Sequence, residues 1–305
     1  MDKILLTAKI NPDLDGLATA YAYQKLLAKQ GKDAEAVIYG RPHVEAEYVI
    51  DRFVITDILY RSKEKYKSFI LCDASSLIGL PHIIRPEDVI EVIDHRESDA
   101  TKDFPDAILH IEFVGAAATL IVEKYIAMKE SIDNASAVLL YGAIFSNTLN
   151  LKGSVTTTRD RDAVTWLEKQ MKIPADYISE MFRIKTLEIE KSFRETFVND
   201  SKEFPIKGFR IGISQLELSN SDKIILEYKG EIFSLLKELQ KEHALSFNFL
   251  SIVDMEKGNN FFITDDPQMQ KILEDVLSVI FTDNIATYGE LILRKQLVPL
   301  LKKNL

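Results

Sequence analysis

Four short apolar runs constrain most strongly what this chain can fold into. They lie at 3–8, 34–40, 67–76 and 88–98 and are rich in Ile, Leu, Val and Phe. Helical patterns at 16–31 and 43–53 stand between the first three runs, and Gly31 is placed to end the first helix. Continuous apolar strands that alternate with helices indicate a parallel sheet covered on both faces. We therefore predict a Rossmann-like α/β domain in the N-terminal half.

The same half continues with helical patterns at 114–129, 135–149 and 156–170, and Thr158 is placed to cap the last of these. The pattern changes after about residue 185. A charged amphipathic stretch is followed by strand patterns at 209–218, 244–254 and 261–266, with a helix pattern at 231–243. We predict a metal-binding domain at 1–185, a linker at 186–195 and a smaller mixed-sheet α/β domain at 196–305.

Charge and composition exclude some classes of partner. The net charge of −9 argues against a general nucleic-acid-binding face, which would need a broad basic surface. No apolar stretch approaches the roughly 18 residues that a membrane helix needs, so we expect no membrane partner. Cys72 is the only cysteine and lies in an apolar run, where we expect it to pack in the core. A cytoplasmic protein in a reducing compartment is expected.

Acidic residues recur where the predicted strands end. Asp13 and Asp15 follow the first run, Asp73 ends the third, and Asp94 and His95 end the fourth. The carboxyl ends of parallel strands meet at one edge of a sheet, which is where ligands bind in such folds. A single aspartate after a strand is more often a helix cap or a turn residue, and a single histidine is more often structural. Their joint occurrence favours a divalent-metal site, and the added imidazole favours manganese.

These motifs, in this order, resemble the DHH phosphoesterase superfamily, and most closely its manganese-dependent (family II) inorganic pyrophosphatases. The matching segments are "KINPDLD" at 9–15, Asp73 in "LCDAS", Asp94-His95-Arg96, "SNTLNLKGSVTTTRDRDA" at 146–163 and "LRKQLVP" near the end of the chain. The C-terminal half resembles the DHH-associated domain that binds anions, and Lys202 matches a lysine of that domain.

The resemblance implies a catalytic site and a substrate. In the family, the N-terminal domain holds two metal ions whose bridging water attacks phosphorus, and basic residues of the C-terminal domain hold the phosphates. Carried onto this sequence, the metal-binding and catalytic residues would be Asp13, Asp15, Asp73 and His95, with Arg96 as a further catalytic residue and Asn147 as a further metal ligand. Lys202, Arg294 and Lys295 would bind substrate. The cofactor would be Mn²⁺ (or Mg²⁺ or Co²⁺), the partner a small phosphate-containing molecule, and the assembly a homodimer through the sheet edge.

The sequence departs from the family at four positions. Lys9 replaces a histidine ligand, Arg96 replaces the second histidine of Asp-His-His, Asn147 replaces an aspartate ligand, and Leu293 replaces an arginine. Asp13, Asp15 and Asp73 give three negative charges, and Lys9 removes one. The remainder suits one divalent ion rather than two. Asn147 would still offer a carbonyl oxygen to the metal. Lys9 would take the place of the other ion, unless it points to solvent.

Three functions are compatible with this pattern. The favoured one is metal-dependent hydrolysis of pyrophosphate or a related small phosphoanhydride or phosphoester. The second is non-catalytic binding of phosphate, nucleotide or polyphosphate in a cleft that has lost its chemistry. The third is hydrolysis of a different substrate, with Arg96 as a two-pronged phosphate clamp that a histidine cannot imitate.

Overall fold

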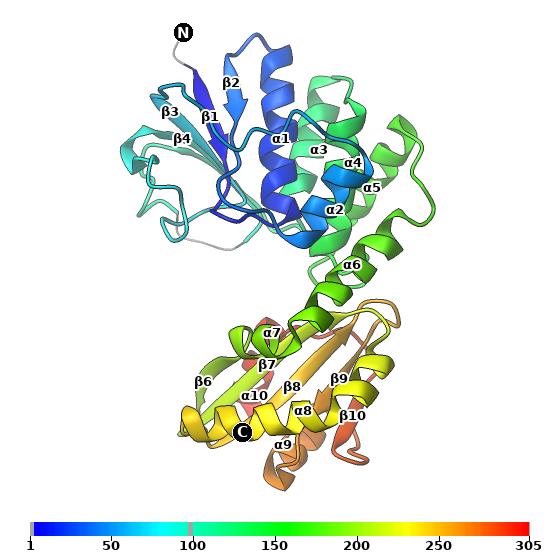
Figure 1. Cartoon of the computed structure of the whole chain (residues 1–305). Helices are drawn as coiled ribbons and strands as arrows, with labels where there is room; N and C mark the ends of the chain where they lie inside the picture. Colours follow the sequence, from blue (N-terminus) through cyan, green and yellow to red (C-terminus); the bar gives the residue numbers. More distant parts are fainter. Residues whose placement is uncertain (1–2, 97–99, 305) are drawn as a thin grey trace. The chain divides into compact units, whose positions relative to one another are not determined.

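The computed structural model describes residues 3–96 and 100–304, which form two units (Figure 1). The first unit ends at Met181, except that Lys152–Ser154 group with the second unit, Phe182–Leu305. Helix α6, Tyr177–Lys191, contains the division. The segment predicted as a linker, 186–195, forms the end of α6 and the start of α7, Phe193–Asn199, and groups with the second unit.

A five-stranded sheet forms the centre of the first unit, and all its neighbouring strands run parallel. The strands are β1 Ile4–Thr7, β2 Ala34–Ala36, β3 Ser68–Cys72, β4 Val89–Asp94 and β5 Ile108–Ile111. Their order is β2-β1-β3-β4-β5. The predicted parallel sheet is therefore confirmed. The edge strand β5 was not predicted because its sequence, ILHI, is a four-residue run interrupted by a histidine.

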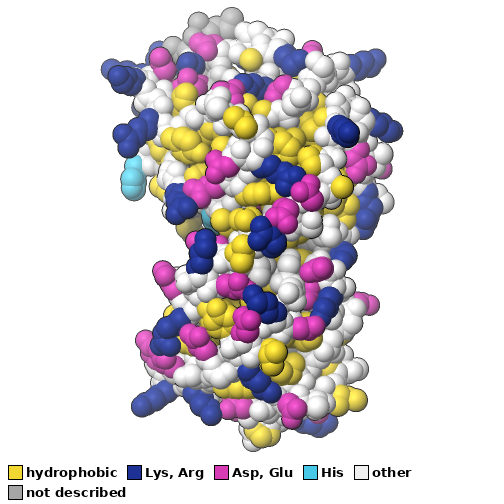
Figure 2. Space-filling model, turned by 45° about the vertical axis from the view of Figure 1, so that its right-hand side comes forward, with side chains coloured by type: hydrophobic (Ala, Val, Ile, Leu, Met, Phe, Trp, Pro, Cys, Tyr) yellow, Lys and Arg dark blue, Asp and Glu magenta, His cyan; other side chains and the backbone are white. Residues whose placement is uncertain are grey.

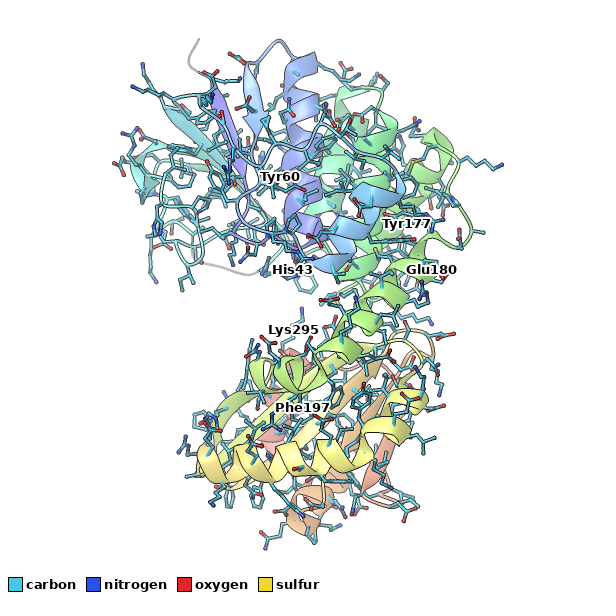
Figure 3. The ribbon with its side chains drawn as sticks, viewed as in Figure 1. His43, Tyr60, Tyr177, Glu180, Phe197 and Lys295 are labelled. Carbon is cyan, nitrogen blue, oxygen red and sulfur yellow. The ribbon has the colours of Figure 1, made fainter. Side chains whose placement is uncertain are left out.

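Helices cover one face of this sheet (Figure 1). They are α1 Leu14–Lys29, α2 Val44–Arg52, α3 Ala117–Met128, α4 Asn134–Asn147 and α5 Thr158–Gln170, and a short 3₁₀ helix spans Pro86–Asp88. Helices α1 and α3 contact the strands, and α4 packs on both of them. Tyr177, at the start of α6 (Figure 3), is fully buried and donates to the Val138 carbonyl at 2.9 Å.

The other face of the sheet is covered without long helices. Its core contains Leu5, Phe69 and Leu71 from the strands. Ala100 and Phe104, which belong to no helix or strand, pack against them. The sheet is thus covered on both faces, as predicted, but one of the two layers consists mainly of loop segments. Those loops start at the carboxyl ends of the strands, where the predicted site residues lie.

The second unit is a mixed five-stranded sheet with helices on both faces. Its strands are β6 Lys202–Ile206, β7 Phe209–Leu218, β8 Phe247–Asp254, β9 Asn259–Ile263 and β10 Ile285–Tyr288, in the order β10-β9-β8-β7-β6. Only β7 and β8 pair in parallel, joined by α8, Ser221–Glu242. Helices α7 and α8 build the core on one face. Helices α9, Pro267–Leu277, and α10, Arg294–Asn304, build the core on the other. The predicted mixed-sheet domain is confirmed.

The surface carries both signs of charge. On the face in Figure 2, acidic and basic side chains are interspersed, as expected for a chain with 47 acidic and 38 basic residues. None of the helices in the described ranges combines the length and the apolar character needed to cross a membrane.

Candidate metal centre

Three side chains meet beyond the carboxyl ends of β1, β3 and β4. Asp15 lies in the first turn of α1, Asp73 follows β3, and His95 follows β4. The parallel pairing continues past the strands, because the Asp73 N–H donates to the Ile93 carbonyl at 2.8 Å. One possible ligand atom from each of the three residues lies within 4.8 Å of the other two. The structure therefore brings together three of the residues predicted as metal ligands.

The orientation of His95 suits a metal ligand. Its Nε2 lies 3.4 Å from Asp73 Oδ1 and 3.8 Å from Asp15 Oδ2. Its Nδ1 lies 3.1 Å from the carbonyl oxygen of Val114, which can only accept a hydrogen bond. We therefore assign the ring proton to Nδ1, which leaves the Nε2 lone pair directed at the two carboxylates. Metal-binding histidines are commonly oriented by such a bond from their other nitrogen.

Asp15 belongs to α1, but its side chain is fully buried against the N-terminus of α3. Its two oxygens accept from the backbone N–H groups of Ala117 and Ala118, each at 2.8 Å. Burial, and next the charge of Asp13, raise the pKa of the Asp15 carboxyl to about 8. These donors work in the opposite direction, because a helix N-terminus favours the carboxylate form. The segment that begins α3 thus supports one candidate ligand directly and His95 through Val114.

Arg96 supplies the positive charge closest to Asp73. Its guanidinium forms an ion pair with Asp73 Oδ1, donates to the Asp73 carbonyl at 3.3 Å, and donates to Asp94 Oδ1 at 3.3 Å. Burial, with the charges of Asp13 and Asp15, raises the pKa of the Asp73 carboxyl well above its usual value. Burial alone would lower the pKa of Arg96, but the charges of Asp73, Asp94 and Asp13 and the hydrogen bond to Asp73 together outweigh it and raise that pKa. Arg96 is therefore a permanent cation at this site.

A small cavity of about 180 Å³ adjoins the group, and Lys9, Asp13, His43 (Figure 3), Asp73 and Arg96 are among its lining residues. Asp13 caps α1, accepting from the Gly16 N–H at 3.0 Å, and it lies outside the group of three ligand residues. Lys9 lines the same cavity, yet the cation paired with Asp73 is Arg96. The role of Lys9 as a replacement for a metal ion stays a prediction.

Asn147, the last residue of α4, reaches the group as a hydrogen-bond donor. Its Nδ2 donates to Asp15 Oδ2 at 2.7 Å, whereas we had expected its carbonyl oxygen to face a metal ion. An aspartate in the same place would set a second carboxylate against Asp15 and would need a cation between them. The amide needs none. Asn147 and Arg96, two of the four departures from the family pattern, thus each place an N–H donor on a candidate metal ligand.

The predicted substrate-binding residues all lie in the second unit. Lys202 is exposed at the start of β6, and Lys295 (Figure 3) is exposed in the first turn of α10. Arg294 is buried and donates to the Ile213 carbonyl at 2.8 Å and to Asp200 Oδ1 at 2.9 Å. These contacts join the start of α10 to β7 and to the residues before β6. Phosphate contact by these three residues stays a prediction.

Most of the groups that hold the ligands could not be predicted from the sequence. Backbone atoms of Val114, Ala117 and Ala118 have no side-chain signature. Asp160 did have a detectable signal, because Thr157-x-x-Asp160 is a capping box at the start of α5. We expected Thr158 to cap this helix, whereas the structure has Thr157, one residue earlier.

The chain thus has two carboxylates and an imidazole at the ends of parallel strands in its first unit, and a mixed sheet in its second unit. Residues 179–304 match the DHHA2 domain family. Over its whole length the chain is similar to manganese-dependent inorganic pyrophosphatases, so the predicted resemblance is confirmed.

Two relatives and one solved structure illustrate the similarity. The chain is 27% identical over 304 residues to a probable manganese-dependent inorganic pyrophosphatase of Deinococcus radiodurans, with 96% of each chain covered. It is 25% identical to the manganese-dependent inorganic pyrophosphatase of Methanothrix thermoacetophila, with 98% of this chain and 97% of the relative covered. The crystal structure of a putative family II inorganic pyrophosphatase of Methanococcus jannaschii shares the fold, with a TM-score of 0.70, 24% identity and 99% of each chain covered.

Proposed function

We propose that this protein is a manganese-dependent phosphohydrolase that acts on pyrophosphate or a related small phosphoanhydride or phosphoester. The observation that carries the proposal is the convergence of Asp15, Asp73 and His95 at one end of the parallel sheet. Similarity to pyrophosphatases over nearly the full length of the chain supports the choice of substrate class.

The donor set suits Mn²⁺. Two carboxylates and one imidazole are oxygen and nitrogen ligands of the kind this ion accepts. The side chain of His95 is 12% exposed and its Nε2 faces both carboxylates, so it needs no rearrangement to bind a cation. When bound, a divalent cation supplies Lewis acidity, which withdraws charge from a phosphate group and makes water a better nucleophile. Asp13 and Arg96, which line the adjacent cavity, are in reach of a substrate that occupies it.

We further propose that the site holds one ion rather than two. Arg96 already neutralises Asp73, and Asn147 satisfies Asp15 without adding a charge. Asp13 and Asp73 would be left to hold a second ion next to a guanidinium. At about 4 Å, the repulsion between two unit positive charges is about 4 kcal/mol with an effective dielectric constant near 20, and it is larger for a divalent ion.

The remaining parts of the proposal concern the substrate and the assembly. Lys202, Lys295 and Arg294 would bind the phosphates of the substrate, because lysine and arginine are the usual partners of such anions. A homodimer is supported by β5, an edge strand whose Ile108 is 62% exposed. A cytoplasmic location is supported by the single, buried cysteine.

One observation favours the alternative, a phosphate-binding protein without catalysis. The oxygens of Asp15 already accept from Ala117, Ala118 and Asn147, and those of Asp73 accept from Arg96. Donors in these positions stabilise the pocket as it stands and compete with a cation for the same lone pairs. The two functions differ in whether phosphate is released.

Phosphate release from pyrophosphate, tripolyphosphate and nucleotides, with Mn²⁺ and with EDTA, separates them. We expect Mn²⁺-dependent release from at least one of these substrates, abolished in Asp73→Asn and kept in Asp254→Asn, a buried carboxylate of the second unit. Metal analysis of the saturated protein should give about one manganese per chain. Saturable binding of phosphate with no release from any substrate would establish the alternative. Two tightly bound ions would contradict the one-ion proposal.

A further inference from the structure

Asp160 is a fully buried carboxylate that does more than cap its own helix. As the third residue of α5, it accepts from the backbone N–H of Thr157 at 2.7 Å, which completes the capping box. Two further donors come from the segment that begins α3. The Gly115 N–H lies 3.0 and 2.9 Å from its two oxygens, and Thr119 Oγ1 donates at 2.6 Å. A capping box alone requires neither of these contacts.

The segment bound by Asp160 is the one that supports two of the three candidate metal ligands. The Val114 carbonyl, next to Gly115, accepts from His95 Nδ1. The N–H groups of Ala117 and Ala118, between the two residues held by Asp160, donate to Asp15. Residues 114 and 116–118 are all at most 1% exposed, so the segment has no contact with water that could replace these bonds.

The fit around this segment is tight. A Cβ atom on Gly115 would lie 2.4 Å from Thr148 Cγ2 and 2.9 Å from Asp160 Oδ2, closer than real Cβ contacts allow. Thr148 directly follows Asn147, which donates to Asp15. A shift of the segment is therefore opposed on one side by Asp160 and on the other by the end of α4.

We propose that Asp160 is a positioning residue for the metal centre: through residues 114–119 it fixes the ring orientation of His95 and the hydrogen bonds of Asp15. It touches neither ligand itself. Its charge suits the place, because it lies at the N-termini of α3 and α5, where the helix dipoles favour an anion. An asparagine has the same shape but turns an NH₂ group toward N–H donors, so Asp160→Asn removes the restraint with little change in volume.

This inference rests on the proposed metal site. Two measurements distinguish failure of the inference from failure of the proposed site. The first is the dissociation constant of Mn²⁺ by titration calorimetry. Groups that orient metal ligands typically change metal affinity 10- to 100-fold, so Asp160→Asn should weaken Mn²⁺ binding at least 10-fold. The second is the ¹⁵N spectrum of His95 in metal-free protein, where the variant should lose the fixed Nδ1–H tautomer of the parent.

Asp254→Asn is the matched control. Asp254 is also fully buried and accepts from backbone N–H groups, at Ser221, Glu256 and Lys257, but it lies in the second unit. The Asp254→Asn variant should be less stable than the parent, but its dissociation constant for Mn²⁺ should lie within 2-fold of the parent value. An equal loss of affinity in both variants, or none in a folded Asp160→Asn, would overturn the inference.

Failure of the proposed metal site would look different, because the parent protein itself would bind no Mn²⁺ while the tautomer of His95 still responded to Asp160→Asn. Should that variant not fold, Thr119→Val removes one donor to Asp160 and keeps the shape of the side chain. A several-fold weaker Mn²⁺ affinity would support the inference, and unchanged affinity would refute it.

Discussion

Replacing Asn147 by aspartate tests the electrostatics of the metal centre directly. The Asn147 amide nitrogen lies 2.7 Å from Asp15 Oδ2; Asp15 is fully buried and Asn147 is half-buried. In Asn147→Asp a carboxylate oxygen takes the place of that nitrogen. Two negative charges 2.7 Å apart repel by about 6 kcal/mol with an effective dielectric constant near 20. The hydrogen bond, worth about 1.5–3 kcal/mol when one partner is charged, is lost as well.

The protein can avoid part of this cost by protonating one carboxyl group. At pH 7 this costs little, because the pKa of the Asp15 carboxyl is already about 8. The remaining loss is mainly that of the Asn147 hydrogen bond to a buried acceptor, about 1–3 kcal/mol, which lowers the melting temperature of a domain of this size by about 2–12 °C. Bound Mn²⁺ removes the repulsion, because the new carboxylate becomes a further ligand.

Thermal unfolding of the metal-free and Mn²⁺-saturated protein measures both effects. We expect Asn147→Asp to be destabilised in EDTA and to regain most of the loss with Mn²⁺, so that its stabilisation by metal exceeds that of the parent. Asn260→Asp is the control, since Asn260 is a fully buried amide in the second unit, bonded to Ser251 and Ile292. It should be destabilised and not rescued. Equal rescue of both variants, or a metal-free Asn147→Asp as stable as the parent, would refute the reasoning.

Three other predictions concern the pH dependence of stability and two basic residues of α10. Burial, and next the charge of Asp13, raise the pKa of Asp15 from 3.8 to about 8, so the folded chain binds more protons than the unfolded chain between these values. Metal-free protein should therefore lose stability as the pH rises from about 4 to about 8. The midpoint of urea unfolding, measured in EDTA, should fall over this range, and a constant or rising midpoint would contradict the prediction. In the second unit, Arg294→Ala should cost about 1–3 kcal/mol, because Asp200 and the Ile213 carbonyl lose the hydrogen bonds from its buried guanidinium. Lys295→Ala should change stability by less than about 0.5 kcal/mol and weaken anion binding; urea unfolding and phosphate titration test the pair.

Local sequence patterns were enough to predict the two folds and the place of three candidate ligands at the ends of strands. Apolar runs that alternate with helix patterns leave few arrangements other than a parallel sheet, and the carboxyl ends of its strands must share an edge. Asp15, Asp73 and His95 follow three such strands, so their convergence follows from local pattern and strand pairing. The mixed sheet of the second unit was likewise indicated by strands that follow one another around a single central helix.

The groups that hold those ligands depend on how the helices pack in three dimensions. Asp15 takes its donors from residues 102, 103 and 132 positions away along the chain, which the packing of α3 and α4 on α1 brings together. No local pattern encodes such contacts, and two of them are backbone groups. From the sequence we assign the additional cation to Lys9, whereas the cation paired with Asp73 in the structure is Arg96. Arg96 pairs with Asp73 because Asp73 directly follows β3, Arg96 lies two residues after the paired strand β4, and the Asp73 backbone is bonded to β4. The choice between the two cations depends on where a side chain points after the strand ends, and that is fixed by packing in three dimensions.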